Sequence, residues 1–172
     1  HFNRAVALKG LQRFEQALSD LDFAISMNER YAAAFHQRGG LLVRLDRFVE
    51  AIASYEKAVL LKPDFAETYK KFGYALHARG RYEEAVAIYD RAIIQRVCDF
   101  STYYNRGLAL QALQRFEDAI HSYDGAIARN PDDHLSFFNR GNAFKSLGRA
   151  EEAVRSYDRA ILIKPDFDEA HL

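Results

Sequence analysis

The chain has 172 residues, and its 24 lysines and arginines balance 24 aspartates and glutamates to a formal net charge of zero. This balance argues against a general nucleic-acid binder, which needs a strong basic excess, and no apolar run approaches the roughly 18 residues that a membrane helix requires. We expect no signal peptide, and the single cysteine, Cys98, excludes an internal disulfide and is typical of a reducing compartment, so a cytoplasmic protein is predicted.

The first complete structural unit is predicted at residues 32–65. Between residues 32 and 45 the apolar side chains follow a helical spacing with one buried side. A second helix is predicted over residues 47–61, with Asp46 as its N-cap. Pro63 ends this helix, since proline cannot continue the backbone hydrogen-bond ladder. The unit is therefore predicted to be a hairpin of two helices.

The same hairpin recurs along the chain with a period of 34 residues. The copies are 1–31 (truncated), 32–65, 66–99, 100–133, 134–167 and the start of a further repeat at 168–172. One of the residues that carry the period is a glycine, found at Gly39, Gly73, Gly107 and Gly141. A fixed period of this length means stacked copies of one small unit. We therefore predict a single array over residues 1–172.

The small residues of the repeat have a steric interpretation. Gly39 in the first helix and Ala51 in the second are expected to let the two backbones of a hairpin approach closely. Ala58 is expected to allow the same approach to the next hairpin. Inserting a bulky side chain at such a place costs about 1–3 kcal/mol. These positions are therefore predicted to be structural.

The order of residues in the unit resembles a tetratricopeptide repeat (TPR). The matching residues of unit 32–65 are Phe35, Gly39, Leu42, Ala51, Tyr55, Ala58 and Pro63. The resemblance covers essentially the whole chain, although Ala5 departs from it at a glycine site, and Glu29 and Val97 depart at proline sites. It implies an all-α fold, a right-handed superhelical solenoid of about ten helices in five TPR hairpins.

Charged residues repeat as well. An acid follows the second aromatic of each copy, or Leu21 in the first copy, at Asp22, Glu56, Asp90, Asp124 and Asp158. An arginine precedes the glycine at Arg4, Arg38, Arg106 and Arg140, with Phe72 in the remaining copy. Each acid pairs either with the arginine of the following repeat or with one in its own repeat, and both arrangements are structural. A further arginine follows every turn, as at Arg47, where a helix dipole does not favour a cation.

The resemblance also implies a binding surface, because the first helices of TPR proteins line a concave groove. The candidate peptide-binding residues are Asn3, His36, Gln37, Lys70, Lys71, Tyr74, Tyr104, Asn105, Phe138, Asn139 and Asn142. This face mixes amides with aromatics, whereas a solvated helix face is dominated by charge. An amide offers both donors and an acceptor to a peptide backbone.

The sixth position of the repeat forms a row of polar residues. It reads Asn3, Gln37, Lys71, Asn105 and Asn139. The row is similar to the asparagine row in the TPR arm of O-linked N-acetylglucosamine transferases, from which Gln37 and Lys71 depart. Asparagine is also common at this position in repeats of no known ligand.

The middle repeat is locally basic because of Lys70, Lys71 and His77. These residues either attract an acidic or C-terminal carboxylate ligand or form an ordinary solvated patch. The carboxylate clamp of chaperone-adaptor TPR domains is absent, since the best register supplies only two of its five residues. No catalytic constellation, metal-ligand spacing or phosphate loop stands out, so we expect neither enzymatic activity nor a metal or cofactor.

We therefore predict a non-catalytic protein–protein interaction module that binds an extended peptide or a partner helix in the concave groove. One alternative is the substrate-recruiting TPR arm of a larger enzyme, such as a glycosyltransferase of the O-linked N-acetylglucosamine type. Another is a self-associating structural scaffold, because both ends lie inside a repeat and the face around Tyr157 and Ile161 is expected to be partly uncovered. No nucleic-acid or membrane partner is expected.

Overall fold

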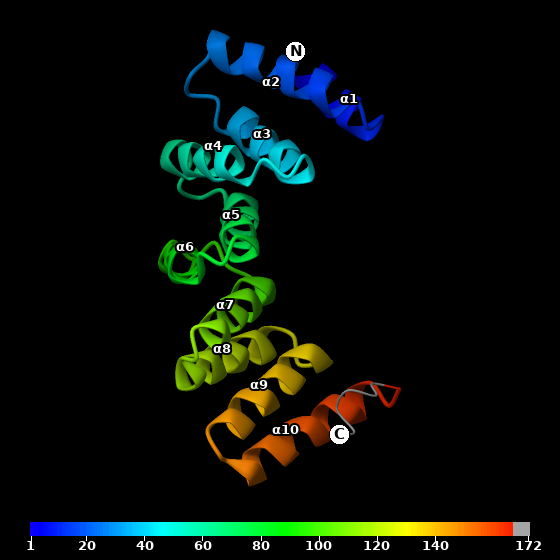
Figure 1. Cartoon of the computed structure of the whole chain (residues 1–172), viewed down its shortest axis with the longest axis vertical. Coiled ribbons are helices and arrows are strands. Elements are labelled where there is room, and N and C mark those ends of the chain that lie inside the picture. Colours follow the sequence, from blue (N-terminus) through cyan, green and yellow to red (C-terminus); the bar gives the residue numbers. More distant parts are fainter. Residues whose placement is uncertain (167–172) are drawn as a thin grey trace. The chain divides into compact units, whose positions relative to one another are not determined.

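The computed structural model describes residues 1–166 of the chain. This part contains ten α-helices and no β-strand, which confirms the predicted all-α fold (Figure 1). The helices are α1 (Phe2–Gly10), α2 (Phe14–Met27), α3 (Ala32–Arg44), α4 (Phe48–Leu61), α5 (Ala66–Ala78), α6 (Tyr82–Ile94), α7 (Phe100–Ala112), α8 (Phe116–Arg129), α9 (His134–Ser146) and α10 (Ala150–Ile163). The expected start of a further repeat at 168–172 lies outside the described residues.

The chain divides into two compact units, one of residues 1–81 with helices α1 to α5 and one that begins at Tyr82 with helices α6 to α10. Within each unit, consecutive helices pack as antiparallel neighbours. The first helix of a hairpin also contacts the first helix of the next hairpin. Such contacts join α1 to α3, α3 to α5, and α7 to α9. In a curved stack of hairpins the row that approaches most closely lies on the inside. Helices α1, α3 and α5 therefore form the inner face of the first unit, and α7 and α9 form that of the second.

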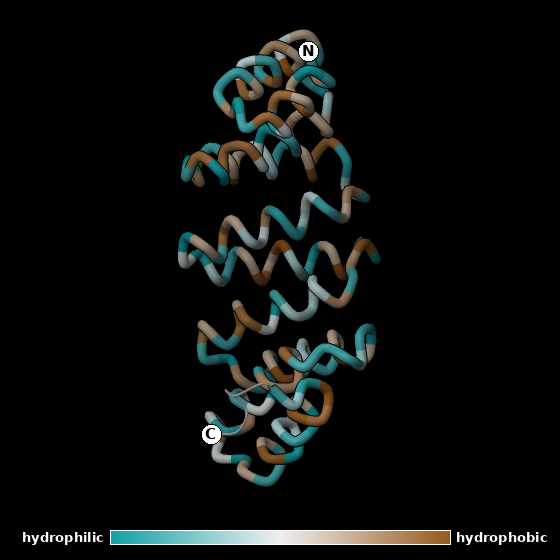
Figure 2. Tube along the Cα trace, turned by 90° about the vertical axis from the view of Figure 1, so that its right-hand side faces the viewer, coloured by the Kyte–Doolittle hydropathy of each residue, from teal (hydrophilic) through white to brown (hydrophobic). Residues whose placement is uncertain are grey.

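Each helix buries one side, and small residues dominate the contacts. Apolar and polar segments alternate along the helices, as amphipathic packing requires (Figure 2). Eight of the ten repeated alanines of the second helices are fully buried: Ala17, Ala51, Ala58, Ala85, Ala92, Ala119, Ala126 and Ala160. The structural role predicted for these small residues is confirmed.

The glycine of the repeat makes room for an aromatic ring, which corrects the expectation that Gly39 faces the backbone of the partner helix. A Cβ added at Gly39 would lie 2.7 Å from Cε1 of Tyr55, and one at Gly107 would lie 2.5 Å from Cε1 of Tyr123. Both tyrosines are almost completely buried. The hairpin therefore closes by placing a tyrosine ring of the second helix against the bare backbone of the first.

The expectation that Asp46 caps the second helix is wrong. Asp46 has a φ of 56°, in the left-handed region, and its N–H donates to the carbonyl of Val43 at 3.1 Å. The N–H of Arg47 donates to the carbonyl of Leu42 at 2.8 Å, so this segment satisfies the last carbonyls of α3. Arg47 is the N-cap of α4 and makes no side-chain cap. Aspartate tolerates the left-handed region, and Gly80 adopts it one repeat later.

In three of the first helices, α3, α7 and α9, an arginine joins two neighbouring hairpins. Arg38 donates from Nε to Oδ1 of Asp22 at 2.7 Å and from Nη1 to Oγ of Ser54 at 2.7 Å. The same three-residue contact recurs as Asp90–Arg106–Ser122 and Asp124–Arg140–Ser156. Of the two arrangements left open by the sequence, the acids therefore pair with the arginine of the following repeat, while the serine lies in the arginine's own repeat.

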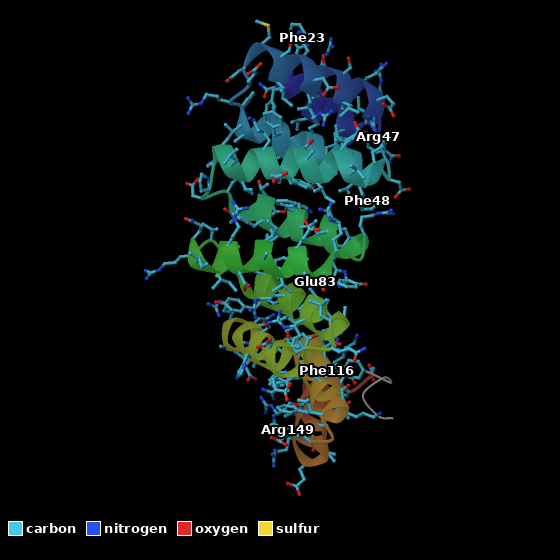
Figure 3. All side chains as sticks on the ribbon, turned by 60° about the vertical axis from the view of Figure 1, so that its left-hand side comes forward. Phe23, Arg47, Phe48, Glu83, Phe116 and Arg149 are labelled. Atoms are coloured by element: carbon cyan, nitrogen blue, oxygen red, sulfur yellow. The ribbon has the colours of Figure 1, made fainter. Side chains whose placement is uncertain are left out.

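In three repeats the arginine after the turn pairs with an acid one helical turn further on. Arg47 donates from Nε and Nη2 to the two carboxylate oxygens of Glu50, at 2.7 and 2.8 Å. The same pairing recurs as Arg115–Asp118 and Arg149–Glu152. Arg47 and Arg149 are labelled in Figure 3, at the starts of α4 and α10. The acid of each pair lies in the first turn, where the helix dipole favours negative charge, and it holds the arginine there.

These two kinds of ion pair should differ in their effect on stability. Arg106→Met should lower the free energy of unfolding by about 1–2 kcal/mol, because Arg106 loses an ion pair and a hydrogen bond that are partly shielded from water. Arg115→Met, the matched control at an exposed pair, should cost about 0.5 kcal/mol or less. Urea unfolding followed by circular dichroism measures both values. Equal costs would show that shielding does not distinguish the two sites.

Candidate functional site

The inner face of the first unit holds six of the residues predicted to bind a peptide. Helix α1 carries Asn3, helix α3 carries His36 and Gln37, and helix α5 carries Lys70, Lys71 and Tyr74. The structure adds Lys9 to this face, since its Nζ donates to Oε1 of Gln37 at 3.0 Å. This hydrogen bond fixes the Gln37 amide and leaves its NH₂ group directed away from Lys9.

Helix α5 contributes the most exposed charged and aromatic groups of this face. Nζ of Lys70 lies 2.8 Å from Oε2 of Glu67, whereas Nζ of Lys71 lies 3.7 Å from Oε1 of the same carboxylate. The Lys71 side chain is 54% exposed, compared with 28% for Lys70. Tyr74 is 57% exposed, which is high for an aromatic residue. Lys71 and Tyr74 are therefore accessible to a partner.

A depression of about 240 Å³ lies on the inner face of the first unit. Its lining residues are Lys9, Gly40, Val43, Arg44, Tyr55, Lys71 and Tyr74. The structure thus brings Lys71 and Tyr74 together, while the other four candidates of this unit lie outside the lining. Arg44 and Tyr55 were not predicted as site residues. Tyr55 was assigned to the core, and only its hydroxyl reaches the depression, beside Gly40.

His36 is held by packing and by a hydrogen bond. Its Nδ1 lies 2.9 Å from Oγ1 of the buried Thr68, and its ring centroid lies 4.7 Å from that of Phe65. Burial lowers the pKa of His36 to about 4. The negative charge of Glu67 opposes this lowering, and Lys9 and Lys71 add smaller lowering contributions. His36 is therefore neutral at pH 7 and adds no positive charge to this face.

The low pKa of His36 predicts a pH dependence of stability. The imidazole has a pKa of about 4 in the folded chain and about 6.5 in the unfolded chain. The unfolded state therefore takes up the proton first, and stability that is fully present above pH 6.5 is lost as the pH falls toward 4. Because the ring is only half-buried, we expect a loss of about 1–2 kcal/mol.

Urea unfolding at neutral pH and near pH 4.5 measures this loss. The control is His36→Phe, which keeps an aromatic ring against Phe65 but has no group that titrates. The part of the pH dependence that belongs to His36 should be missing from this variant. Identical pH dependence in the two proteins would contradict the assignment.

The second unit contributes the remaining candidates from α7 and α9: Tyr104, Asn105, Phe138, Asn139 and Asn142. Nδ2 of Asn139 donates to Oη of Tyr104 at 3.1 Å and to the carbonyl of Leu135 at 3.0 Å. The side chain of Asn105 is half-buried and makes no hydrogen bond to any residue between 1 and 166. Asn139 and Tyr104 are thus fixed relative to each other, whereas the amide of Asn105 is available.

The tyrosine hydroxyls near this face differ from repeat to repeat. In the second unit Tyr123 donates to Oε1 of Gln111 at 2.9 Å, and Tyr157 donates to Oδ1 of Asn142 at 2.8 Å. Asn142 is therefore already engaged by the protein. Tyr55 stands at the same place of its repeat and is only 1% exposed. Its hydroxyl has no hydrogen-bond partner in the described part of the chain.

Comparison with family profiles decides which family these repeats represent. The profile described as tetratricopeptide repeat matches residues 2–64 and 104–169, and a TPR repeat profile matches residues 73–114. The chain belongs to the tetratricopeptide repeat family. No curated protein matches the sequence.

Solved TPR structures share the fold of this chain at low sequence identity. YrrB, described as a TPR protein with an unusual peptide-binding site, is 23% identical, with a TM-score of 0.87 over 99% of this chain and 88% of that one. MamA is 20% identical, with a TM-score of 0.89 over 99% and 93% of the two chains. PilW, a type IV pilus biogenesis factor, is 20% identical, with a TM-score of 0.77 over 98% and 79%.

The TPR chain shows few other features that could form a site. Between residues 1 and 166, no helix is long and apolar enough to cross a membrane. The same residues contain no group of three or more histidine, cysteine or acidic side chains that could hold a metal ion. Tyr157 and Ile161, at the face expected to be partly uncovered, are half-buried, and Ile161 packs against Phe137 and Ala160. The inner faces therefore remain the best candidates for binding.

Proposed function

We propose that this TPR chain is a non-catalytic interaction module that binds an extended peptide or a partner helix along the inner face of its first helices. The observation that carries the proposal is Asn105, a half-buried amide on α7 without a hydrogen-bond partner between residues 1 and 166. Such an amide can donate to and accept from a peptide backbone. Asn139 adds a carbonyl oxygen, because only its NH₂ group is used within the protein.

Aromatic side chains support the same surface. The Tyr104 ring lies 6.1 Å from that of Tyr123, and the Phe138 ring lies 5.8 Å from that of Tyr157. The two inner rings thus pack on the buried Tyr123 and the half-buried Tyr157, and they present rigid apolar area at low entropic cost. YrrB, which shares the fold, is described as having a peptide-binding site. That description supports peptide binding as a use of the fold, while the residues of the site are argued from this chain.

An array of short peptides tests the proposal, followed by calorimetry on the peptides that bind. Asn105→Ala should weaken their affinity by about two- to twelvefold, since one hydrogen bond is worth about 0.5–1.5 kcal/mol. Asn139→Ala should have a similar effect. It removes the side-chain carbonyl that would accept a hydrogen bond from the peptide backbone, and it removes the amide that holds Tyr104 in place. His121→Ala, at an exposed position of the outer helix α8, is the control and should bind normally. Unaltered binding by Asn105→Ala would exclude the inner face as the binding surface.

The alternative of a substrate-recruiting arm uses the same face. Asn105 and Asn139 match the asparagine row of the O-linked N-acetylglucosamine transferase arm, whereas Gln37 and Lys71 do not. A glycosyltransferase domain encoded in the same gene would favour this alternative. The self-associating scaffold is tested separately by analytical ultracentrifugation, in which a monomer at high micromolar concentration would exclude it.

A further inference from the structure

We propose that the depression between α1, α3 and α5 is a subsite for an acidic side chain, aspartate or glutamate, of the bound peptide. This inference rests on the proposed peptide-binding function and adds the chemical class of one ligand residue. The depression lies on the same inner helices as the predicted groove. Its volume of about 240 Å³ is below the range of roughly 300–1,000 Å³ that is usual for small-molecule pockets. It therefore suits one side chain better than a cofactor.

The first argument is the charge of the lining. Three of the lining residues, Lys9, Arg44 and Lys71, are cationic and come from three different helices, whereas none is acidic. Like charges gathered around one depression repel one another, and an anion that lies among them relieves this repulsion. The nearest carboxylate, Glu67, is closer to Lys70 at 2.8 Å than to Lys71 at 3.7 Å. The protein itself therefore neutralises this cluster only in part.

The cations are also placed so that they can bind an oxyanion. Lys9 uses one of its three N–H groups for Gln37 and keeps the others. The guanidinium carbon of Arg44 lies 4.6 Å from the centroid of the Phe14 ring, a stacked position that leaves the N–H edges of an arginine free to bind a carboxylate. Arg44 makes no ion pair within the described residues. Burial lowers the pKa of Lys9, and the positive charges of Lys71 and Arg44 lower it further.

The second, independent argument is the hydroxyl of Tyr55. In two repeats of the other unit the equivalent hydroxyls, of Tyr123 and Tyr157, are satisfied by Gln111 and Asn142, whereas Tyr89, like Tyr55, makes no hydrogen bond within the described residues. The residues of the Tyr55 repeat that occupy those two places are Val43 and Gly40, which offer no polar side chain, and both line the depression. A Cβ added at Gly40 would lie 3.7 Å from Oη of Tyr55, so the hydroxyl is at the surface of the depression.

Within the described residues no fully buried side-chain polar atom lacks a hydrogen-bond partner, so the Tyr55 hydroxyl is open to the depression, where a bound group can accept its hydrogen bond in place of water. Burial raises the pKa of Tyr55 far above its ordinary value, so the hydroxyl keeps its proton and can donate. A carboxylate accepts hydrogen bonds and cannot donate them, which is the complement of three cations and one hydroxyl. The side-chain amide of glutamine has the same shape as the carboxylate of glutamate but carries no negative charge. The subsite should therefore distinguish glutamate from glutamine.

The test uses an array of short peptides in which one central position is glutamate, glutamine, phosphoserine or serine, probed with the full chain. Peptides with glutamate should bind about three- to tenfold more tightly than their glutamine counterparts, as expected for a charge-assisted hydrogen bond. Lys9→Gln and Lys71→Gln should each remove most of this preference. Lys57→Gln, at an exposed position of α4 outside the lining, makes the same charge change and should keep it. Tyr55→Phe should reduce the preference while circular dichroism shows the same melting temperature within a few degrees.

The outcomes separate this inference from the function on which it rests. Equal binding of the glutamate and glutamine peptides, with Asn105→Ala still weakening both, would overturn the acidic subsite and leave the peptide groove in place. A preference for phosphoserine without one for glutamate would overturn the assignment to a carboxylate. Loss of glutamate preference in Lys57→Gln as well as in Lys9→Gln would show long-range attraction and no subsite. Absence of any bound peptide would overturn the proposed function and this inference together.

Discussion

Gly107→Leu is expected to lower the free energy of unfolding by about 3 kcal/mol or more, at the upper end of the usual cost of overpacking. A Cβ at Gly107 would already lie 2.5 Å from Cε1 of Tyr123, and the rest of a leucine would lie closer still. Tyr123 cannot move aside easily, because its ring is completely buried and its hydroxyl donates to Gln111. The helices α7 and α8 must therefore separate.

The control for this substitution is Gly10→Leu. Gly10 is the last residue of α1, is exposed, and has nothing within 4 Å of an added Cβ. Without a clash, leucine should be neutral or stabilise the helix by up to about 1 kcal/mol through its better helix propensity. Thermal and urea unfolding of the two variants give the comparison. A melting temperature of Gly107→Leu equal to that of the wild type would mean that the glycine–tyrosine contact does not hold the hairpin together.

Tyr123→Ala is expected to have an equally large effect through the opposite change. Removing a fully buried aromatic ring leaves a cavity against Gly107 and costs about 3–5 kcal/mol. Tyr123→Phe removes only the hydrogen bond to Gln111 and should cost about 1 kcal/mol. The difference between these variants, measured by urea unfolding, separates the contribution of the ring from that of the hydroxyl.

The two changes should compensate each other in a double variant. Leucine at position 107 can occupy space that the tyrosine ring leaves, so Gly107→Leu combined with Tyr123→Ala should cost less than the sum of the single changes by about 1 kcal/mol or more. Strict additivity would indicate that the two residues do not share one space. This double-variant cycle therefore tests the contact itself, independently of the overall stability of the array.

The fold could be predicted from the sequence because local signals and the repeat period agree. Pro63 and the apolar spacing placed the end of α4 at Leu61, where the helix is observed to end. Two details could not be predicted in this way. Asp46 looks like an N-cap in sequence, but backbone hydrogen bonds make it the left-handed end of α3, and only its equivalence with Gly80 signals this. The partner of Gly39 is set by the direction of the Tyr55 ring, which periodicity does not report.

The candidate site was predictable to a smaller extent. The family resemblance indicated the inner helices and hence Lys71, Tyr74 and Asn105, but it gave no information about hydrogen bonds within the protein. Asn142 looks available in sequence and is engaged by a tyrosine hydroxyl. Tyr55 looks like a core residue, yet its hydroxyl reaches the inner face because small or apolar residues stand where an amide would otherwise satisfy it. Such relations depend on which side chains meet across helices.

Photo-crosslinking with benzoylphenylalanine tests the central claim, binding on the inner face, most directly. The photoreactive residue replaces Tyr74 on α5 or Phe138 on α9, and in control proteins it replaces Val49 on α4 or Val154 on α10, which are 76% and 56% exposed on the second helices. With peptides selected on the array, the proteins labelled at positions 74 and 138 should form covalent adducts, and those labelled at positions 49 and 154 should not. Adducts confined to positions 49 and 154 would contradict the account.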